Sequence, residues 1–439
     1  MMIGMTDKFL IKGGVPLEGS TIVRGSKNAA TKLMIASLLT DAPCVIENIP
    51  LSAEIDITRE LCEKIGSTVS FEDDHTIRIE TPDIRTSRVP ELSRKNRIPI
   101  LALGPLLHRT GIAEVPVLGG CPIGHRPIDF HVAALRDMGV RIERREHSYY
   151  AEAAEIRGAH IAFPHPSVGA TENVILAATR ARGTTQIKNA SVEPEILNLI
   201  DMLRMMGARI SVNEKERIIE IEGVSSLGGA QIRAMPDRNE IVSFAAAALA
   251  TQGSVFIDEI EDRYLRAFLA VLDTIGAGYE KRENGLRFFK KSQMRAASVE
   301  TAPHPAFMTD WQQPFVVLLT QADGESRVHE TVYEDRFGYT EDLKRMGAHI
   351  EVMNDCNGFP RCSYASKGYN HVAYIQGPRT LRGTTIRIND IRAGIAHVIA
   401  ALAAEGESVI EGVHHLDRGY EAIDSRLQSL GARIKRMTD

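Results

Sequence analysis

Polar and apolar residues follow one another along the chain in a pattern that occurs six times. In each copy a helical stretch ends in a glycine and strand-forming residues follow: LCEKIGSTVS, LRDMGVRIE, LRMMGARIS, LDTIGAGYE, LKRMGAHIE and LQSLGARIK. The glycines are Gly66, Gly139, Gly207, Gly276, Gly347 and Gly431, with separations of 73, 68, 69, 71 and 84 residues. Glycine at such a place usually adopts the left-handed conformation that ends a helix. Six such turns at a nearly constant period predict one fold unit used six times.

Each copy also contains a helix that is apolar nearly all the way round. These helices begin near Lys27, Arg97, Thr171, Arg238, Asp310 and Asp390. A helix without a polar face is buried on every side. Short strands of alternating polarity, such as TTQIKNA and SVFIDEI, indicate sheets with one face on helices and one in water. We therefore expect an α/β protein in which sheets surround buried parallel helices, with three units in each of two domains.

Composition narrows the classes of function. The chain has 439 residues, 44% hydrophobic and 25% charged, and its formal net charge of -5 argues against general nucleic-acid binding. No stretch reaches the ~18 charge-free apolar residues that a membrane helix needs, and the N-terminus lacks a signal-peptide pattern. Five cysteines without such a signal favour reduced thiols. We expect a cytoplasmic protein, a monomer or weak homo-oligomer, with no nucleic-acid or membrane partner.

Four of the cysteines carry no predicted chemistry. Cys44 and Cys62 lie in apolar patterns and are expected to be buried. Cys356 and Cys362, with His371 nearby, raise the question of a metal, but their spacing matches no common zinc pattern. We therefore expect no metal site. The last repeat interval is long because of residues 353–372, whose Gly, Pro, Asn and Ser content predicts a surface insertion.

Charged residues occupy the first turn of most of the apolar helices. Lys27, Arg97, Arg238 and Arg392 are cationic, whereas the third helix has Thr171 with Glu172. A helix N-terminus already carries about half a positive charge, so a cation there opposes local helix stability. Several such ends facing one site would bind anions strongly. The alternative is that these long side chains extend outward to solvent.

In the fifth helix, Asp310 takes the place of the cation. Among cations its pKa would fall, so it would be ionised and able to accept a proton from a hydroxyl. The alternative is a helix N-cap, for which Asp is favoured. The local pattern in PAFMTDWQQ leaves both interpretations open.

The fifth cysteine lies in an unusual loop, VLGGCPIGHRP. Cys121 stands between a glycine pair and a Pro–Ile–Gly turn, and His125 and Arg126 follow it. Glycines let a backbone move and approach a ligand closely. Neighbouring cations raise the thiolate fraction of a cysteine. This loop therefore predicts a reactive thiol rather than a packing residue.

Seven segments resemble those of the enolpyruvyl transferases: GSKNAA, GGCPIGHRP, SVGATEN, EPEI, TAPHPAFMTD, YEDRF and HHLDRGYE. They occur in the family's order from about residue 8 to the C-terminus, and the cysteine loop is specific to the branch that uses UDP-N-acetylglucosamine. The resemblance implies an EPSP synthase-like fold, two inside-out α/β barrels with three βαβαββ units each. We place one domain at residues 20–235 and the other at residues 1–19 and 236–439.

The resemblance also implies a reaction. The enolpyruvyl group of phosphoenolpyruvate would pass to the 3-hydroxyl of UDP-N-acetylglucosamine by addition and elimination, releasing phosphate, which is the first committed step of peptidoglycan synthesis. In the family the matching cysteine donates a proton to C3 or adds to C2, and it takes part in product release. The glycines of its loop would let it close over both substrates. No cofactor or metal is required in this scheme.

Individual roles carry over residue by residue. Catalysis is implied for Cys121, Asp310, Lys27, Arg392 and Arg418, of which Asp310 would take the sugar hydroxyl proton and the two arginines would hold the phosphoenolpyruvate carboxylate. Lys27 and Asn28 would touch the substrates at the domain cleft, with Arg97 and Arg126 completing the phosphate side. The nucleotide-sugar pocket would be lined by Arg126, Pro127, Ile128, Asp129, His131, His165, Ser167, Val168, Gly169 and Val332.

Three departures from the family pattern concern substrate recognition. His165 stands where a lysine is usual, Leu101 replaces a tryptophan, and NEIVSF follows Asp237 and Arg238 in place of the common sequence. A histidine is only partly charged at neutral pH, so diphosphate binding could depend on pH. These departures leave two alternatives open: a different nucleoside or UDP-sugar acceptor, or a non-catalytic paralogue that binds a UDP-sugar.

Overall fold

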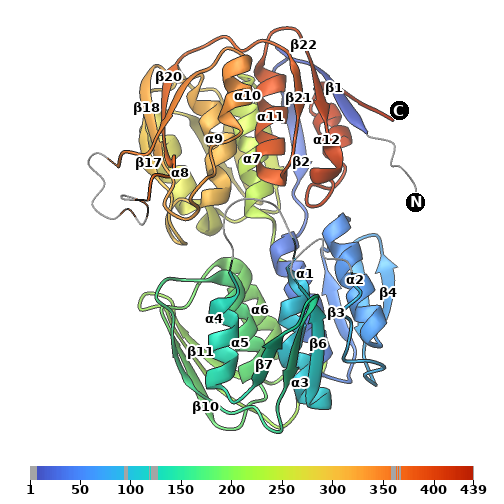
Figure 1. Ribbon diagram of the computed structural model, residues 1–439. Coiled ribbons are helices and arrows are strands. Elements are labelled where there is room, and N and C mark those ends of the chain that lie inside the picture. Colours follow the sequence, from blue (N-terminus) through green and yellow to red (C-terminus); the bar gives the residue numbers. More distant parts are fainter. Residues whose placement is uncertain are drawn as a thin grey trace. The chain divides into compact units, whose positions relative to one another are not determined.

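The computed structural model describes residues 7–92, 97–117, 119, 127–356, 362, 364 and 367–438. The chain divides into two compact units (Figure 1). The first unit is formed by described residues from 24 to 236, and the second by residues 7–23 together with described residues from 237 to 438. Cys121, His125 and Arg126 of the predicted thiol loop lie outside the described residues.

Three sheets form the wall of the first unit. In order across each sheet, their strands are β13 (Gln231–Arg233), β3 (Cys44–Glu47), β5 (Thr76–Glu80) and β4 (Thr68–Asp73); β6 (Ile112–Pro116), β8 (Ser148–Glu152) and β7 (Arg141–Arg144); and β11 (Arg209–Asn213), β12 (Ile218–Glu222), β10 (Thr184–Lys188) and β9 (His160–Ala162). The four-stranded sheets each combine antiparallel pairs with one parallel pair, β13 with β3 and β9 with β10.

Six helices fill the first unit. They are α1 (Lys27–Ala36), α2 (Ala53–Ile65), α3 (Leu103–Thr110), α4 (Asp129–Asp137), α5 (Val168–Ala178) and α6 (Pro194–Met205). From Ala29 in α1 and from Ala170 in α5, every residue to the end of the helix is buried. Helices α2, α4 and α6 are amphipathic and have one exposed face. This is the burial expected for apolar helices enclosed by sheets.

The second unit repeats the arrangement. Its sheets are β21 (Thr385–Arg387), β22 (Glu407–Glu411), β1 (Lys8–Lys12) and β23 (Arg433–Met437); β15 (Gly278–Arg282), β16 (Gly285–Phe289), β14 (Ser254–Asp258) and β2 (Glu18–Ile22); and β17 (Ser298–Glu300), β18 (Gly324–His329), β20 (Val372–Gly377) and β19 (His349–Met353). Each has one parallel pair: β21 with β22, β14 with β2, and β17 with β18. In Figure 1 these sheets surround the helices α7, α9 and α11.

The helices of the second unit again divide into buried and amphipathic ones. They are α7 (Arg238–Ala250), α8 (Arg266–Ile275), α9 (Gln312–Leu319), α10 (Thr340–Arg345), α11 (Ile391–Ala403) and α12 (Ile423–Ser429). All residues of α7 and α9 are buried, and α7, α9 and α11 pack against one another. The expected α/β architecture, built from one repeated fold element, is therefore confirmed.

The six glycines that mark the repeat have the conformation expected of them. Their φ angles are all positive, between 73° and 134°, and each follows an amphipathic helix. A side chain is strained in this region, so glycine lets the chain leave the helix and enter the next strand. A strand begins two residues after each of the six glycines, so the prediction that a strand follows each turn is confirmed.

Helix starts agree less closely with the sequence prediction. Helices α1 and α7 begin at Lys27 and Arg238, but α5 begins at Val168 rather than near Thr171. Arg97 and Asp310 lie at short 3-10 turns, Ile98–Ala102 and Thr309–Trp311, that precede α3 and α9. Both α-helices then carry a proline at their third residue, where the missing N–H has no partner to lose.

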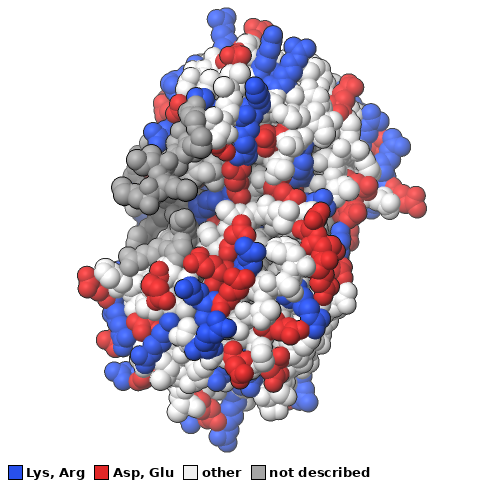
Figure 2. Space-filling view, turned by 90° about the vertical axis from the view of Figure 1, so that its right-hand side faces the viewer, with Lys and Arg blue, Asp and Glu red and all other residues white. Residues whose placement is uncertain are grey.

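The surface agrees with the composition. On the face in Figure 2, Lys and Arg are interspersed with Asp and Glu, so this face has no broad basic stripe of the kind that binds nucleic acid. Among the described residues, none of the helices has both the length and the apolar character that crossing a bilayer demands.

The contact between α3 and α5 gives a stability prediction. A Cβ on Gly104 would lie 3.0 Å from the backbone N and Cα of Ala177. Alanine normally stabilises a helix relative to glycine, but here it must push two central helices apart. We expect Gly104→Ala to lower the free energy of unfolding by about 1–3 kcal/mol.

The control is Gly338→Ala, since no atom lies within 4 Å of a Cβ at that exposed position. Chemical denaturation of both variants checks the prediction. Equal stabilities for Gly104→Ala and the unsubstituted protein would contradict the close packing of α3 on α5.

Candidate active site

In the second unit, the carboxylate of Asp310 lies between two guanidinium groups. Arg336 Nη2 donates to Asp310 Oδ1 over 2.6 Å, and Arg392 Nε donates to Oδ2 over 3.1 Å. Asp310 belongs to the turn before α9, Arg336 to the loop after β18, and Arg392 to the first turn of α11. Three segments far apart in sequence therefore supply one ionic cluster.

Burial makes these ion pairs strong. The side chains of Arg336 and Arg392 are 4% and 5% exposed, and that of Asp310 is 22% exposed. Burial alone would raise the pKa of Asp310, but the charges of Arg392 and Arg336 outweigh it and hold that pKa well below its usual range. Asp310 is thus ionised in the free protein, as the sequence predicted. It is not a helix N-cap, because its carboxylate is bound by arginines and caps no backbone N–H.

Arg392 has a second partner that the sequence analysis missed. Its Nη1 donates to the hydroxyl of Tyr420 over 3.1 Å, and that hydroxyl lies 2.9 Å from Ser243 Oγ. Burial raises the pKa of Tyr420 to about 12, so it stays a neutral phenol. Arg392 is therefore fixed in direction by Asp310 and Tyr420. Arg336 and Tyr420 stand in YEDRF and HHLDRGYE, but nothing local in those segments shows what they contact.

The cations at the helix starts of this unit are buried rather than extended to solvent. Arg238 is completely buried, and its Nη1 lies 3.4 Å from His304 Nδ1. Acidic N-caps precede both arginines: Asp237 accepts from the backbone of α7, and Asp390 accepts from that of α11. For Arg238 and Arg392 the solvent alternative is therefore excluded.

Glu330 fixes the loops around Asp310. It is fully buried, and its Oε1 accepts from the backbone N–H groups of Val332 and Tyr333 at 2.8 and 3.1 Å. Its Oε2 accepts from Thr309 Oγ1 at 2.8 Å, the residue before Asp310. Val332, a predicted pocket residue, is half-buried in this loop, as is Arg418 in the loop before α12.

The first unit holds the remaining described candidates. Lys27 and Asn28 begin α1 and are half-buried. Arg97 is also half-buried, and its Nη2 lies 3.5 Å from the carbonyl oxygen of Pro127, so the structure brings the segments of these two predicted residues together. Ile128 and Asp129 follow Pro127 at the start of α4.

His131, from α4, packs directly on the start of α5. A Cβ at Gly169 would lie 3.2 Å from the imidazole, so a larger residue there would force the ring to shift by a few tenths of an ångström. Asn173 Nδ2 lies 3.1 Å from His131 Nδ1. Burial, with the charge of Arg97, lowers the pKa of His131 to about 3, so the ring is neutral. Ser167 and Val168 precede Gly169 at the N-terminus of α5, where backbone N–H groups are available to an anion.

The three departures from the family pattern have different surroundings. His165 is exposed and lies on Phe130, with ring centroids 4.8 Å apart. Leu101 is 2% exposed and packs in the core of the first unit. Asn239 is buried, and Glu240 accepts from Arg426 Nη1 at 2.6 Å. Only His165 is placed to meet a ligand from solvent.

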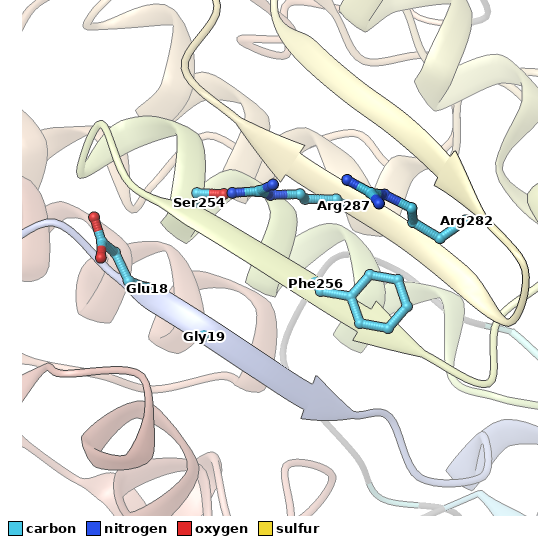
Figure 3. Close-up of a pocket in the computed structure, with 6 residues that line it drawn as sticks. All are labelled: Glu18, Gly19, Ser254, Phe256, Arg282 and Arg287. Atoms are coloured by element: carbon cyan, nitrogen blue, oxygen red, sulfur yellow. The ribbon is translucent and has the colours of Figure 1, made fainter.

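A hollow of about 550 Å³ lies elsewhere, on the sheet of β2, β14, β16 and β15 (Figure 3). Its lining residues are Glu18, Gly19, Ser254, Phe256, Arg282 and Arg287. Arg287 Nε donates to Ser254 Oγ over 2.7 Å, and Arg282 pairs with Glu280. It contains none of the candidate residues, and its arginines already have partners.

Six α/β repeats around buried helices define the fold class, and the second unit holds an ionised carboxylate between two buried arginines. The family model described as EPSP synthase (3-phosphoshikimate 1-carboxyvinyltransferase) matches residues 11–427. The chain therefore belongs to the EPSP synthase family of enolpyruvyl transferases, and the resemblance seen in the sequence is confirmed.

Relatives with curated names are similar over nearly their whole length. The UDP-N-acetylglucosamine 1-carboxyvinyltransferase of Protochlamydia amoebophila (strain UWE25) is 45% identical over 437 residues, covering 98% of this chain and 94% of the relative. The protein of the same name from Chlamydia pneumoniae is 44% identical over 426 residues, covering 95% and 93%.

Solved structures share the fold. The enolpyruvyl transferase NikO from Streptomyces tendae superposes with a TM-score of 0.87 at 22% identity, covering 99% of this chain and 100% of that one. An EPSP synthase from Acinetobacter baumannii has a TM-score of 0.73 at 16% identity, again covering 99% and 100%. The expected EPSP synthase-like fold is confirmed.

The buried His131 gives a prediction for the pH dependence of stability. Its pKa is about 3 in the folded chain and about 6.5 in an unfolded one. The unfolded state therefore binds more protons between these values, and stability falls as the pH drops below about 6.5. From pH 7 to pH 5 the loss from this residue is about 1–2 kcal/mol.

Denaturation of the protein and of His131→Gln at several pH values tests this. The variant is expected to lose less stability between pH 7 and pH 5, and its difference from the unsubstituted protein should be constant above pH 7.5. Parallel curves over the whole range would show that His131 is not buried in its neutral form.

Proposed function

We propose that this chain transfers the enolpyruvyl group of phosphoenolpyruvate to the 3-hydroxyl of UDP-N-acetylglucosamine and releases phosphate. Relatives at 44–45% identity are named UDP-N-acetylglucosamine 1-carboxyvinyltransferase, which supports this proposal. The observation that carries the chemistry is the Asp310 carboxylate held between Arg336 and Arg392. We place the reaction in the cytoplasm, at the first committed step of peptidoglycan synthesis, and expect a monomer or weak homo-oligomer.

Arg392 and Arg418 would bind the carboxylate of phosphoenolpyruvate. A guanidinium pairs with a carboxylate through two parallel N–H groups, and Arg392 is already directed by Tyr420. When a substrate carboxylate binds Arg392, it competes with Asp310 for the same cation. The Arg392–Asp310 bond, at 3.1 Å the longer of the two, would be the one exchanged.

This exchange would turn Asp310 into a usable base. A carboxylate held by two arginines is a weak base, because its pKa lies far below the working pH. The loss of one ion pair raises that pKa, while Arg336 keeps the carboxylate in place. Asp310 would then take the proton of the sugar 3-hydroxyl as its oxygen attacks C2 of phosphoenolpyruvate.

The other steps of the addition and elimination need an acid at C3. Cys121 is proposed to deliver that proton, and Lys27, Arg97 and Arg126 to bind the phosphate that leaves when C3 is deprotonated again. Cys121 and Arg126 lie outside the described residues, so these roles depend on the family motif GGCPIGHRP.

In the first unit, the residues around α4 and α5 would hold the nucleotide sugar. The N-terminus of α5, at Ser167, Val168 and Gly169, offers backbone N–H groups to a phosphate. His131 is neutral and would act as a hydrogen-bonding wall rather than a cation. Pro127, Ile128 and Asp129 would line the same pocket.

A different acceptor is the second candidate, and His165 is the observation that favours it. This residue replaces the usual lysine and is exposed beside Phe130. An uncharged imidazole attracts a diphosphate less than an ammonium does. A nucleoside acceptor without a diphosphate would follow if His165 does not support that group. Another UDP-sugar acceptor, or UDP-sugar binding without catalysis, are the remaining alternatives.

Phosphate release from phosphoenolpyruvate tests the acceptor. We expect release with UDP-N-acetylglucosamine and none with shikimate 3-phosphate, measured in parallel on the full chain. Release with other nucleoside acceptors but not with this UDP-sugar would establish the second candidate. Binding of the UDP-sugar by calorimetry without any release would establish the non-catalytic one.

Asp310→Asn tests the base. The amide keeps the shape but cannot accept the proton, so kcat should fall by about 10²–10⁴ while KM for the UDP-sugar changes far less. The matched control is Glu341→Gln, another carboxylate-to-amide change at an exposed residue of α10. An Asp310→Asn enzyme with unchanged kcat would leave Asp310 only the role of neutralising Arg336 and Arg392.

A further inference from the structure

Four potential metal ligands converge in the second unit, outside the candidate active site. They are His329 at the end of β18, Cys356 after β19, Cys362, and His371 just before β20. Their ligand atoms all lie within 4.8 Å of one another. His371 Nε2 is 2.9 Å from Cys356 Sγ and 3.0 Å from Cys362 Sγ, and His329 Nε2 is 3.3 Å from Cys362 Sγ.

These separations are close to those around a tetrahedral zinc ion. Zn–S bonds of about 2.3 Å and Zn–N bonds of about 2.0–2.1 Å place neighbouring ligand atoms about 3.3–3.8 Å apart. The three histidine–cysteine distances lie at or just below this range, and none of the four ligand atoms is more than 4.8 Å from another. Small shifts of the side chains would therefore complete the site. Two thiolates and two imidazoles in this geometry select zinc over the oxygen-preferring magnesium and calcium ions.

The second nitrogen of each histidine has the partner expected in a metal site. His329 Nδ1 lies 3.2 Å from Glu300 Oε2, and His371 Nδ1 lies 2.5 Å from the carbonyl oxygen of Tyr369. Because each Nδ1 atom faces an oxygen acceptor, the proton of each ring lies on Nδ1. Both Nε2 atoms therefore present a lone pair to the cluster. Histidines that bind metals are usually oriented by such a carboxylate or carbonyl.

The cluster is also protected from solvent. His329 and His371 are completely buried, and the two cysteines are partly buried. The backbone N–H of Tyr364 donates to Cys362 Sγ over 3.3 Å. Two thiolates balance the charge of one zinc ion, so the occupied site would be neutral in this buried place.

We propose that His329, Cys356, Cys362 and His371 form a structural zinc site. With four protein ligands the ion would have no open position for substrate, so its role is to hold the chain rather than to catalyse. The ligands join the long connection between β19 and β20 to the end of β18, and β18 and β20 are paired. Cys356, Cys362 and His371 of the predicted insertion would thus be fastened to the sheet.

Hydrogen bonds of residues next to the metal ligands connect the proposed zinc site with the loops around Asp310. Glu330, the residue after His329, accepts from Thr309 beside Asp310. Tyr364, two residues after Cys362, donates its hydroxyl to the carbonyl oxygen of Val332 over 2.9 Å. A metal at this point would therefore stabilise both the insertion and the loop that Glu330 anchors.

Metal content of the full chain is the first test. The protein is purified under reducing conditions without chelator, equilibrated with zinc, dialysed, and analysed by mass spectrometry. We expect about one zinc per chain, loss of that zinc in Cys362→Ser and His371→Gln, and retention in the control His349→Gln, an exposed histidine of β19. Zinc that persists in both cluster variants would overturn the proposal.

Cobalt(II) binding provides a second test, which uses the unsubstituted protein and so does not depend on whether a variant folds. Bound to the metal-free, unsubstituted protein, it should give thiolate-to-cobalt charge transfer and the visible absorption of tetrahedral geometry. A chelator should lower the melting temperature of the zinc-loaded protein but not that of the metal-free one. Folded, reduced protein that gives no thiolate–cobalt band and retains less than a tenth of an equivalent of zinc would also overturn the proposal.

Discussion

The candidate site depends on the ion pairs of Asp310 with Arg336 and Arg392. Both guanidinium groups are almost completely buried, and a buried cation left without a counter-charge costs several kcal/mol. In the free protein Asp310 supplies that charge. A ligand that displaces Asp310 must bring an anionic group of its own. Under the proposed function, the interaction that stabilises the unit would therefore also select anionic ligands.

The fold explains why charged groups gather at helix starts. Helices α7, α9 and α11 are buried on all sides, so they have no lateral face on which a polar side chain could meet solvent. Only their ends can carry function. The acidic N-caps Asp237 and Asp390 satisfy the first N–H groups and offset the arginine that follows each of them. The negative charges of Asp237 and Asp390, together with that of Asp310, thus stabilise the buried arginines.

Much of the fold could be predicted because it depends on local rules repeated six times. A glycine such as Gly66 or Gly347 marks a left-handed turn wherever it ends a helix, and an apolar helix predicts its own burial. The surroundings of Asp310 could not be predicted in the same way. Its local sequence suited an N-cap equally well, and its partners lie 26 and 82 residues away in the chain. The ion pairs with Arg336 and Arg392, which the fold brings together, show that Asp310 is not an N-cap.

The proposed metal ligands could be predicted from local sequence even less than the surroundings of Asp310. Cys356, Cys362 and His371 have no familiar spacing, and the fourth ligand, His329, lies 27 residues before Cys356. The pairing of β18 with β20 places residue 329 directly opposite residue 372, so the sheet register creates the cluster. From there the backbone leads to Glu330, which holds both the loop of Val332 and the hydroxyl of Thr309. Since Thr309 also accepts from Arg336, one buried carboxylate links the four-ligand cluster to the arginine that holds Asp310. Order at the cluster and order at Asp310 are therefore parts of the same network of hydrogen bonds.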